Sequence, residues 1–230
     1  MRCLPAARFG FCPQVLISGD NINIDLHVHT KYSADCNTDP IKIIRTEISK
    51  GVDCIAVTDH NNFSSFKNFN KKIKIIKGEE ISTNKGHLIG LFLEESVKSR
   101  DFSEACDEIR SQGAVSILPH PFRAHKDPGS LVRAVDMVEA FNSRTSLAKN
   151  EAALELARIS NKPVICGSDA HFLSELGSAT VEVETENVHE AGKLLLKGRF
   201  KMNFTQSPFY VHPMTWIVKG GKIAGHLVRR

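Results

Sequence analysis

The sequence predicts an α/β fold, most simply a (β/α) barrel with fewer or shorter units than the full eightfold form. Three observations predict it. Short apolar runs alternate with longer stretches of helical character along most of the 230 residues. The apolar runs number about seven or eight, as a barrel of this kind requires. Side chains with metal-binding chemistry follow several of these runs directly. A doubly wound open sheet is the alternative that the same pattern allows.

Each candidate strand is a short run rich in branched apolar residues, bounded by residues that favour turns. These runs are Ile22–His27, Asp53–Val57, Ile73–Lys77, His87–Leu93, Ala114–Leu118, Val135–Ala140, Pro163–Cys166 and Thr180–Val183. Because most of the intervening stretches are long enough to hold a helix, we expect a mainly parallel sheet.

The helices are predicted from the signals at their ends. The stretch Pro40–Lys50 follows Thr38 and Asp39, which place a capping side chain just before a proline in the first turn. Gly51 then marks its end. The other predicted helices are Phe102–Gln112, Leu147–Ser160 and Asn187–Lys197.

The length of the chain suggests one main domain. We expect residues 22–206 to form this domain, with an N-terminal extension at residues 1–21 and a C-terminal tail at residues 207–230 that packs on the barrel. The tail has no clear periodicity, and we expect its Tyr210 and Trp216 to pack back onto the body.

The N-terminal stretch combines basic residues with a short apolar part. Pro5 and Pro13 interrupt it, and no convincing small-residue cleavage site follows. We therefore interpret residues 1–21 as an extension or a mis-assigned start rather than a secretory signal.

Composition excludes several classes of protein. Apolar residues make up 41% and charged residues 24%, so the chain is neither disordered nor fibrous. No apolar run has the length that a membrane span needs. The six cysteines form no CxxC pair, which favours free thiols, a reducing compartment and a cytoplasmic location. The net charge of +4 suits an anionic substrate but does not by itself indicate nucleic acid.

Imidazole and carboxylate groups recur at or near the ends of the predicted strands. His27 and His29 are two residues apart on a strand, so both side chains lie on one face and can bind one ion. The other groups of this kind are Asp59, His60, Glu79, Glu80, His87, His120, Asp169 and His171. In a βα barrel the carboxyl ends of the strands converge on one face. The set therefore predicts a metal cluster, for which Zn, Mn or Fe is suitable.

The order of these motifs resembles that of the PHP (polymerase and histidinol phosphatase) family. The resemblance is carried by the segments HVHTKYSAD, VTDHN, GEEIS, GHLIG, PHPF and GSDAH. It extends from about Ile24 to His171. The sequence most resembles the small stand-alone members of the family. It implies a distorted (β/α)7 barrel, with up to three metals in an active site at the C-terminal ends of the strands.

The resemblance also implies three sets of metal ligands. The first set is His27, His29, Glu80 and Asp169. Glu80 would bridge to a second metal that His87 and His120 complete. The third set is Asp35, His60 and His171.

Because Glu79 and Glu80 are adjacent, the choice of the bridging carboxylate depends on how the motif is aligned. The family pattern Gly-x-Glu before an Ile-Ser pair selects Glu80, and Glu79 should then face the opposite side of its strand. Asp59 is expected to orient His60 or a metal-bound water. The alternative for Asp59 is a structural cap at the end of the strand.

Such a site is suited to the hydrolysis of phosphate esters. Two metals can lower the pKa of a bridging water, bind phosphoryl oxygens and stabilise the leaving oxygen, so the expected nucleophile is a metal-bridging hydroxide. The expected cofactors are two or three divalent ions of Mn, Zn or Fe. Arg123 and Arg144 follow predicted strand ends on the same face, and we expect both to bind substrate phosphate.

The substrate implied by the resemblance is small and phosphorylated: a nucleotide, an oligonucleotide end or another metabolite such as histidinol phosphate. We expect no membrane and no obligate protein partner. One alternative is a non-catalytic RNA- or complex-binding subunit, like the protein component of ribonuclease P, but such a scaffold does not need metal ligands. Another is metal-dependent hydrolysis of a C–N or C–O bond.

Overall fold

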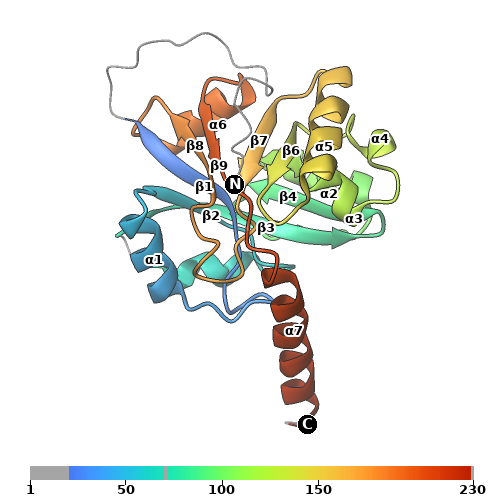
Figure 1. Ribbon diagram of the computed structural model, residues 1–230. Coiled ribbons are helices and arrows are strands. Elements are labelled where there is room, and N and C mark those ends of the chain that lie inside the picture. Colours follow the sequence, from blue (N-terminus) through green and yellow to red (C-terminus); the bar gives the residue numbers. More distant parts are fainter. Residues whose placement is uncertain (1–20, 70–71, 229–230) are drawn as a thin grey trace.

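The computed structural model describes residues 21–69 and 72–228. Within them, one curved sheet has the strand order β7-β6-β5-β4-β3-β2-β1-β8-β9 (Figure 1). The strands are β1 (Ile22–Val28), β2 (Cys54–Val57), β3 (Lys74–Thr83), β4 (Gly86–Leu91), β5 (Val115–Leu118), β6 (Met137–Asn142), β7 (Val164–Gly167), β8 (Ala179–Val183) and β9 (Lys201–Phe204). The sequence analysis did not predict β9.

The sheet curves into a nearly closed barrel. The end of β1 pairs in parallel with the segment after β7 through a bridge between Val28 and Ala170. The backbone nitrogen of His29 donates to the carbonyl oxygen of Ala170 at 3.0 Å. Ser168 Oγ donates to the carbonyl oxygen of His27 at 3.1 Å. These bonds place the polar residues that follow β1 and β7 side by side, and they confirm a barrel over an open sheet.

The sheet is mixed, which corrects the expectation of a mainly parallel one. The strands β1, β2 and β3 are parallel to one another, as are β5, β6 and β7. In contrast, β4 is antiparallel to both β3 and β5, and β8 and β9 add antiparallel pairs beside β1. The short connection between β3 and β4 explains the antiparallel direction of β4. Because β3 extends to Thr83, only Asn84 and Lys85 separate it from β4. A two-residue connection permits a hairpin but no parallel crossover.

The four predicted helices are present, and side chains cap three of them. They are α1 (Pro40–Ser49), α2 (Phe102–Ser111), α5 (Leu147–Ile159) and α6 (Val188–Leu196). Asp39, Asp101 and Asn187 each accept hydrogen bonds from backbone nitrogens in the first turn of α1, α2 and α6. The structure also contains helical segments that the sequence analysis did not predict: η2 (Phe63–Asn68), α3 (Pro121–Ala124), α4 (Pro128–Leu131) and α7 (Val211–Val228).

Three clusters of buried apolar side chains hold these elements together. The largest includes Ile24 and Leu26 of β1, Phe141 of β6 and Leu195 of α6. A second cluster packs α2 against the sheet, and a third packs α1 against it. Each fully buried aliphatic side chain contributes about 1.5–3 kcal/mol. This packing supports the strand ends from which the polar groups project.

The tail differs from the sequence-based expectation. Its last part is the helix α7, which extends away from the barrel in Figure 1. Tyr210 is 46% exposed and Trp216 is 77% exposed, so the expectation that they pack onto the body is wrong. The contacts with the body are made by other side chains of α7. Of these, Val211 is buried.

Other expectations concern the chain as a whole. Except for Asn21, the predicted N-terminal extension and its interpretation as a non-secretory segment lie outside the described residues. The four cysteines of the described part, Cys36, Cys54, Cys106 and Cys166, are buried and free. Among the described helices, none has the length and apolar character needed to span a membrane.

Candidate active site at the mouth of the barrel

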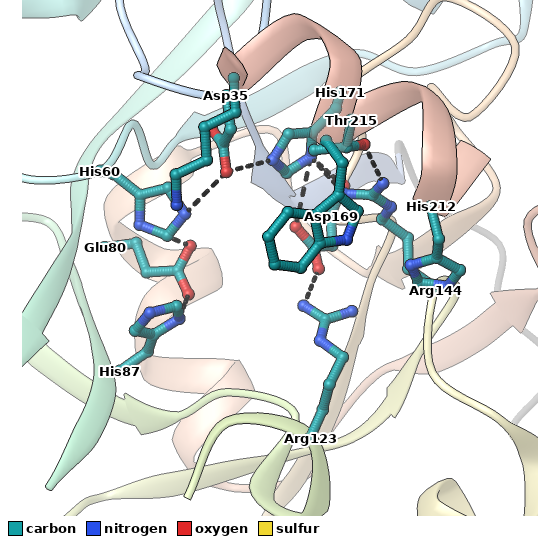
Figure 2. A pocket seen from close by; sticks show the side chains of 12 residues that line it. Asp35, His60, Glu80, His87, Arg123, Arg144, Asp169, His171, His212 and Thr215 are labelled. Atoms are coloured by element: carbon teal, nitrogen blue, oxygen red, sulfur yellow. Dashed lines mark hydrogen bonds and ion pairs between the residues drawn. The ribbon is translucent and has the colours of Figure 1, made fainter. Parts of the chain in front are cut away.

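A cavity of about 190 Å³ lies at the mouth of the barrel, where the strand ends and α7 meet. Figure 2 shows its side chains converging from several strands and from α7. It is lined by Asp35, His60, Glu80, His87, Arg123, Arg144, Asp169, His171, His212, Thr215, Trp216 and Lys219. His27, His29 and His120 are buried and contact the acidic residues of this cavity. The barrel therefore brings all the expected ligand residues into one cluster.

Glu80 lies at the centre of this cluster, and its two carboxylate oxygens face different histidines. Oε2 lies 3.1–3.5 Å from ring nitrogens of His27, His29 and His60. Oε1 lies 2.7 Å from a ring nitrogen of His87 and 3.1 Å from one of His120. A carboxylate arranged in this way can bind one ion through each oxygen.

Two aspartates occupy the other side of the cluster. Asp35 Oδ2 lies 3.1 Å from His171 Nε2 and 3.3 Å from His60 Nε2. Asp169 Oδ1 lies 3.3 Å from His29 Nε2. With Glu80, these aspartates place three carboxylates among the imidazole rings.

Among the described residues, three overlapping groups have the geometry of a metal site. In each group all the ligand atoms lie within 4.8 Å of one another. The groups are His27, His29, Glu80 and Asp169; His29, Asp35, His60 and His171; and His60, Glu80 and His87. They agree with the implied sets except that His29 also joins the group of Asp35, and His60 takes the place of His120 beside Glu80 and His87.

The unpaired ring nitrogens of the cluster fit bound metal ions. Buried nitrogens of His60, His87 and His171 form no hydrogen bond, although carboxylate oxygens lie within 3.5 Å of them. An unpaired buried nitrogen is costly, and coordination of a shared cation satisfies both the nitrogen and the nearby oxygen. Imidazole and carboxylate together are the ligands that Zn, Mn and Fe accept.

The charges of the cluster also favour a cation. Burial by itself lowers the pKa of His29, but hydrogen bonds with Asp169 and Glu80 raise that pKa to about 10. Burial acts to raise the pKa of Glu80, yet the charges of His60 and His87 hold it well below its ordinary value. The carboxylates raise the pKa values of His27, His29 and His87 and so favour protons on these three imidazoles. Divalent ions in the same place supply the positive charge that those protons otherwise provide.

The backbone is strained at two of the expected ligands. His120 has φ of 30° and Asp169 has φ of 54°, in the left-handed region that side chains with a Cβ rarely occupy. Each residue comes just after a strand, β5 and β7 respectively. The unusual conformation turns the chain sharply at the strand end. It directs the side chain of His120 toward Glu80 and that of Asp169 toward His29. Strain of this kind is concentrated at functional sites.

Glu139 is a residue of the site that the sequence analysis missed. It is buried within β6, where its Oε1 accepts a hydrogen bond from His27 Nδ1 at 2.9 Å. Its Oε2 accepts from the backbone nitrogen of His120 and from Asn142 Nδ2, both at 2.9 Å. Gly167 lies so close that an added Cβ would be 2.4 Å from Glu139 Oε1. The available signal was an acidic residue inside an otherwise apolar strand, which needs a partner when buried.

Glu79 and Asp59 make contacts outside the ring of histidines. Glu79 faces the opposite side of β3, as expected, and accepts hydrogen bonds from Ser96 Oγ at 3.0 Å and the backbone nitrogen of Val97 at 3.2 Å. Asp59 accepts hydrogen bonds from the backbone nitrogen and the Oγ1 of Thr30, both at 2.6 Å. Asp59 thus fixes the turn that follows His29, and its contacts are those of the cap alternative.

The two arginines expected to bind phosphate both line the cavity. Arg123 forms an ion pair with Asp169 Oδ2 and donates to Asn142 Oδ1 at 3.0 Å, and its side chain is 27% exposed. The guanidinium of Arg144 is almost buried. Its nitrogens contact Glu175, His171 and Thr215 (Figure 2 shows the last two contacts). A contact between Arg144 and phosphate would require it to exchange one of these partners.

Comparison with known proteins identifies the family. The model of the PHP domain matches residues 25–179. An uncharacterized protein of Methanocaldococcus jannaschii is 36% identical over 185 residues, which cover 75% of this chain and 75% of that protein.

Two solved structures share the fold at low sequence identity. One is a two-domain protein from Bacteroides vulgatus containing a predicted PHP-like metal-dependent phosphoesterase. Its TM-score is 0.64 at 20% identity, covering 85% of this chain and 70% of that one. The other is a lesion-specific endonuclease from Pyrococcus furiosus, with a TM-score of 0.59 at 17% identity, covering 80% of this chain and 58% of that one. The family match, the relative and the shared barrel agree, so the chain belongs to the PHP domain family, a family of metal-dependent phosphoesterases.

Proposed function

We propose that the protein hydrolyses phosphate esters with two or three divalent ions of Mn, Zn or Fe. The proposed ligands are His27, His29, Asp35, His60, Glu80, His87, His120, Asp169 and His171. The observation that carries the proposal is the position of Glu80, whose two oxygens face separate sets of ring nitrogens in a cavity that also presents a guanidinium group. Ions bound there supply Lewis acidity that polarises a phosphoryl group and activates water.

The chain's own groups have distinct tasks in this proposal. Glu139 holds the ring of His27 so that Nε2 faces the cluster, because its carboxylate accepts the proton on Nδ1. Asp59 steadies the turn between His29 and Asp35 through Thr30. Arg123 binds a phosphoryl oxygen beside the ions, since it lines the cavity and is partly exposed. We propose for Arg144 a positioning role through His171.

The proposed substrate is a nucleotide, an oligonucleotide end or another small phosphorylated metabolite. The test is a screen of protein loaded with Mn or Zn against adenosine 3′,5′-bisphosphate, histidinol phosphate, short RNA and an N-acyl amide. We expect release of phosphate or nucleotide that a chelator abolishes and added metal restores. Cleavage of the amide alone would support C–N hydrolysis instead. Binding of RNA without cleavage, unchanged by the chelator, would support a non-catalytic scaffold.

Replacing Arg123 with alanine should separate phosphate binding from metal binding. We expect kcat/KM to fall by a factor of about 30–1,000, the loss of a charged phosphate contact worth about 2–4 kcal/mol. The metal content should stay unchanged. The matched control is Arg110→Ala, because Arg110 is an exposed arginine of α2 that pairs with its helical neighbour Asp107 and donates to the carbonyl oxygen of Ala134.

Steady-state kinetics and elemental analysis of the same preparations give the two readouts. Loss of metal in Arg123→Ala would mean that this arginine positions Asp169. Wild-type efficiency would mean that it does not touch the substrate.

A further inference from the structure

One face of α7 forms a wall of the cavity. The cavity-lining residues of this helix are His212, Thr215, Trp216 and Lys219. Their spacing of three, four and seven residues places them on a single side of the helix. This side carries an imidazole, a hydroxyl, an indole and an ammonium group. Such groups are suited to contact a polar, anionic ligand rather than to pack against an apolar core.

Contacts at two places hold α7 over the site. At one end, Arg144 Nη2 donates to Thr215 Oγ1 at 2.5 Å, and the same arginine contacts His171. Further along, Lys222 Nζ donates to the carbonyl oxygens of Lys31 and Ser33 at 2.7 and 2.6 Å. Those carbonyls belong to the turn that carries Asp35. The helix is therefore anchored to the segments that present the cluster, and Trp216 and Lys219, which lie between the anchors, line the cavity.

Trp216 is the unusual residue on this wall. It lines the cavity, yet it is 77% exposed. Among the described residues, no ring–ring or cation–π interaction involves its indole. An exposed indole lacks the favourable free energy that its burial would provide. A planar ligand stacked on the ring recovers that free energy.

We propose that Trp216 is a stacking platform for the base of a nucleoside phosphate, whose phosphate lies at Arg123 and the carboxylate–histidine cluster. The position of the phosphate in this inference rests on the proposed phosphoesterase function. The position of the base is inferred from the exposed indole and from Lys219, which places a positive charge one turn further along the same side of α7. The sequence from Ser207 onward contains no acidic residue, so no carboxylate of α7 repels an anionic ligand. Base–aromatic stacking needs a flat ring and tolerates any base.

Indole fluorescence tests the platform directly, because Trp216 is the single tryptophan of the chain. The probes are adenosine 5′-monophosphate and ribose 5-phosphate, which differ only in the base. Both are titrated into zinc-loaded full-length protein. We expect adenosine 5′-monophosphate to quench the emission and to bind about tenfold more tightly than ribose 5-phosphate.

Calorimetry on variants supplies a second readout. Trp216→Ala should weaken binding of adenosine 5′-monophosphate about tenfold and leave ribose 5-phosphate unaffected, whereas Trp216→Phe should keep most of the affinity. The control is Ile217→Ala, an exposed neighbour that does not line the cavity.

The outcomes separate this inference from the proposed function. Equal affinity for the two probes, or unchanged nucleotide binding in Trp216→Ala, would overturn the platform even if phosphate esters are cleaved. Tighter binding of the nucleotide than of ribose 5-phosphate, kept in Trp216→Phe and lost in Trp216→Ala, in a protein that cleaves no phosphate ester, would uphold the platform and overturn the hydrolytic function.

Discussion

Replacing Glu80 with glutamine should remove most of the bound metal and reduce phosphoesterase activity by more than about a hundredfold. Glutamine keeps the shape of the side chain but offers one carbonyl oxygen and an NH₂ group, which cannot bind a cation. Both carboxylate oxygens of Glu80 face histidine nitrogens, Oε1 toward His87 and His120 and Oε2 toward His27. Losing either oxygen would therefore break the proposed bridge between two ions. Elemental analysis after incubation with Mn or Zn, together with phosphate release, measures both effects.

Glu79→Gln is the matched control for this experiment. Glu79 is the adjacent residue and is equally buried, but it faces Ser96 and Val97 on the other side of β3. Burial also raises the pKa of Glu79, so its environment tolerates a neutral side chain. The variant should keep its metal and most of its activity. If Glu79→Gln lost metal and Glu80→Gln did not, the assignment of the bridging carboxylate would be wrong. Less than one equivalent of metal in the wild-type protein would contradict the cluster itself.

Glu139→Gln should weaken metal binding by about 10–100-fold although Glu139 is not a proposed ligand. Three groups donate hydrogen bonds to its two oxygens: His27 Nδ1, the backbone nitrogen of His120 and Asn142 Nδ2. A glutamine NH₂ group must face at least one of these donors, which leaves a buried donor without an acceptor. The ring of His27 then loses the partner that keeps Nε2 directed toward Glu80. Titration against a competing chelator measures the change in metal affinity.

A strand carboxylate away from the site provides the control for Glu139. Glu182 lies in β8, where its Oε1 accepts a hydrogen bond from Asn21. Glu182→Gln should leave metal affinity unchanged. Thermal unfolding of metal-free protein checks for a general loss of stability, since an unsatisfied buried donor costs about 1–3 kcal/mol. Equal metal affinity in Glu139→Gln and wild type would show that the carboxylate does not position His27.

Much of this protein could be predicted from local patterns in its sequence. The period of two along a strand places His27 and His29 on one face and separates Glu80 from Glu79, and the structure shows both arrangements. The start of α1 was predictable because Asp39 and Pro40 act within one turn of the chain. Most side chains with metal-binding chemistry were recognisable for the same reason, because they lie next to a short apolar run, whereas Asp35 was predicted only from the family resemblance.

The remaining features depend on contacts between residues distant in the sequence, and only the tertiary structure decided them. The barrel closes through Val28 and Ala170, and Glu139 gains its role only because closure places His27 beside it. A local pattern contains no information about such pairs. The same holds for α7, whose position over the cavity depends on contacts of Arg144 and Lys222 with segments far along the chain. The sequence therefore predicts a packed position for Trp216, whereas in the fold this residue lies exposed at the mouth of the site.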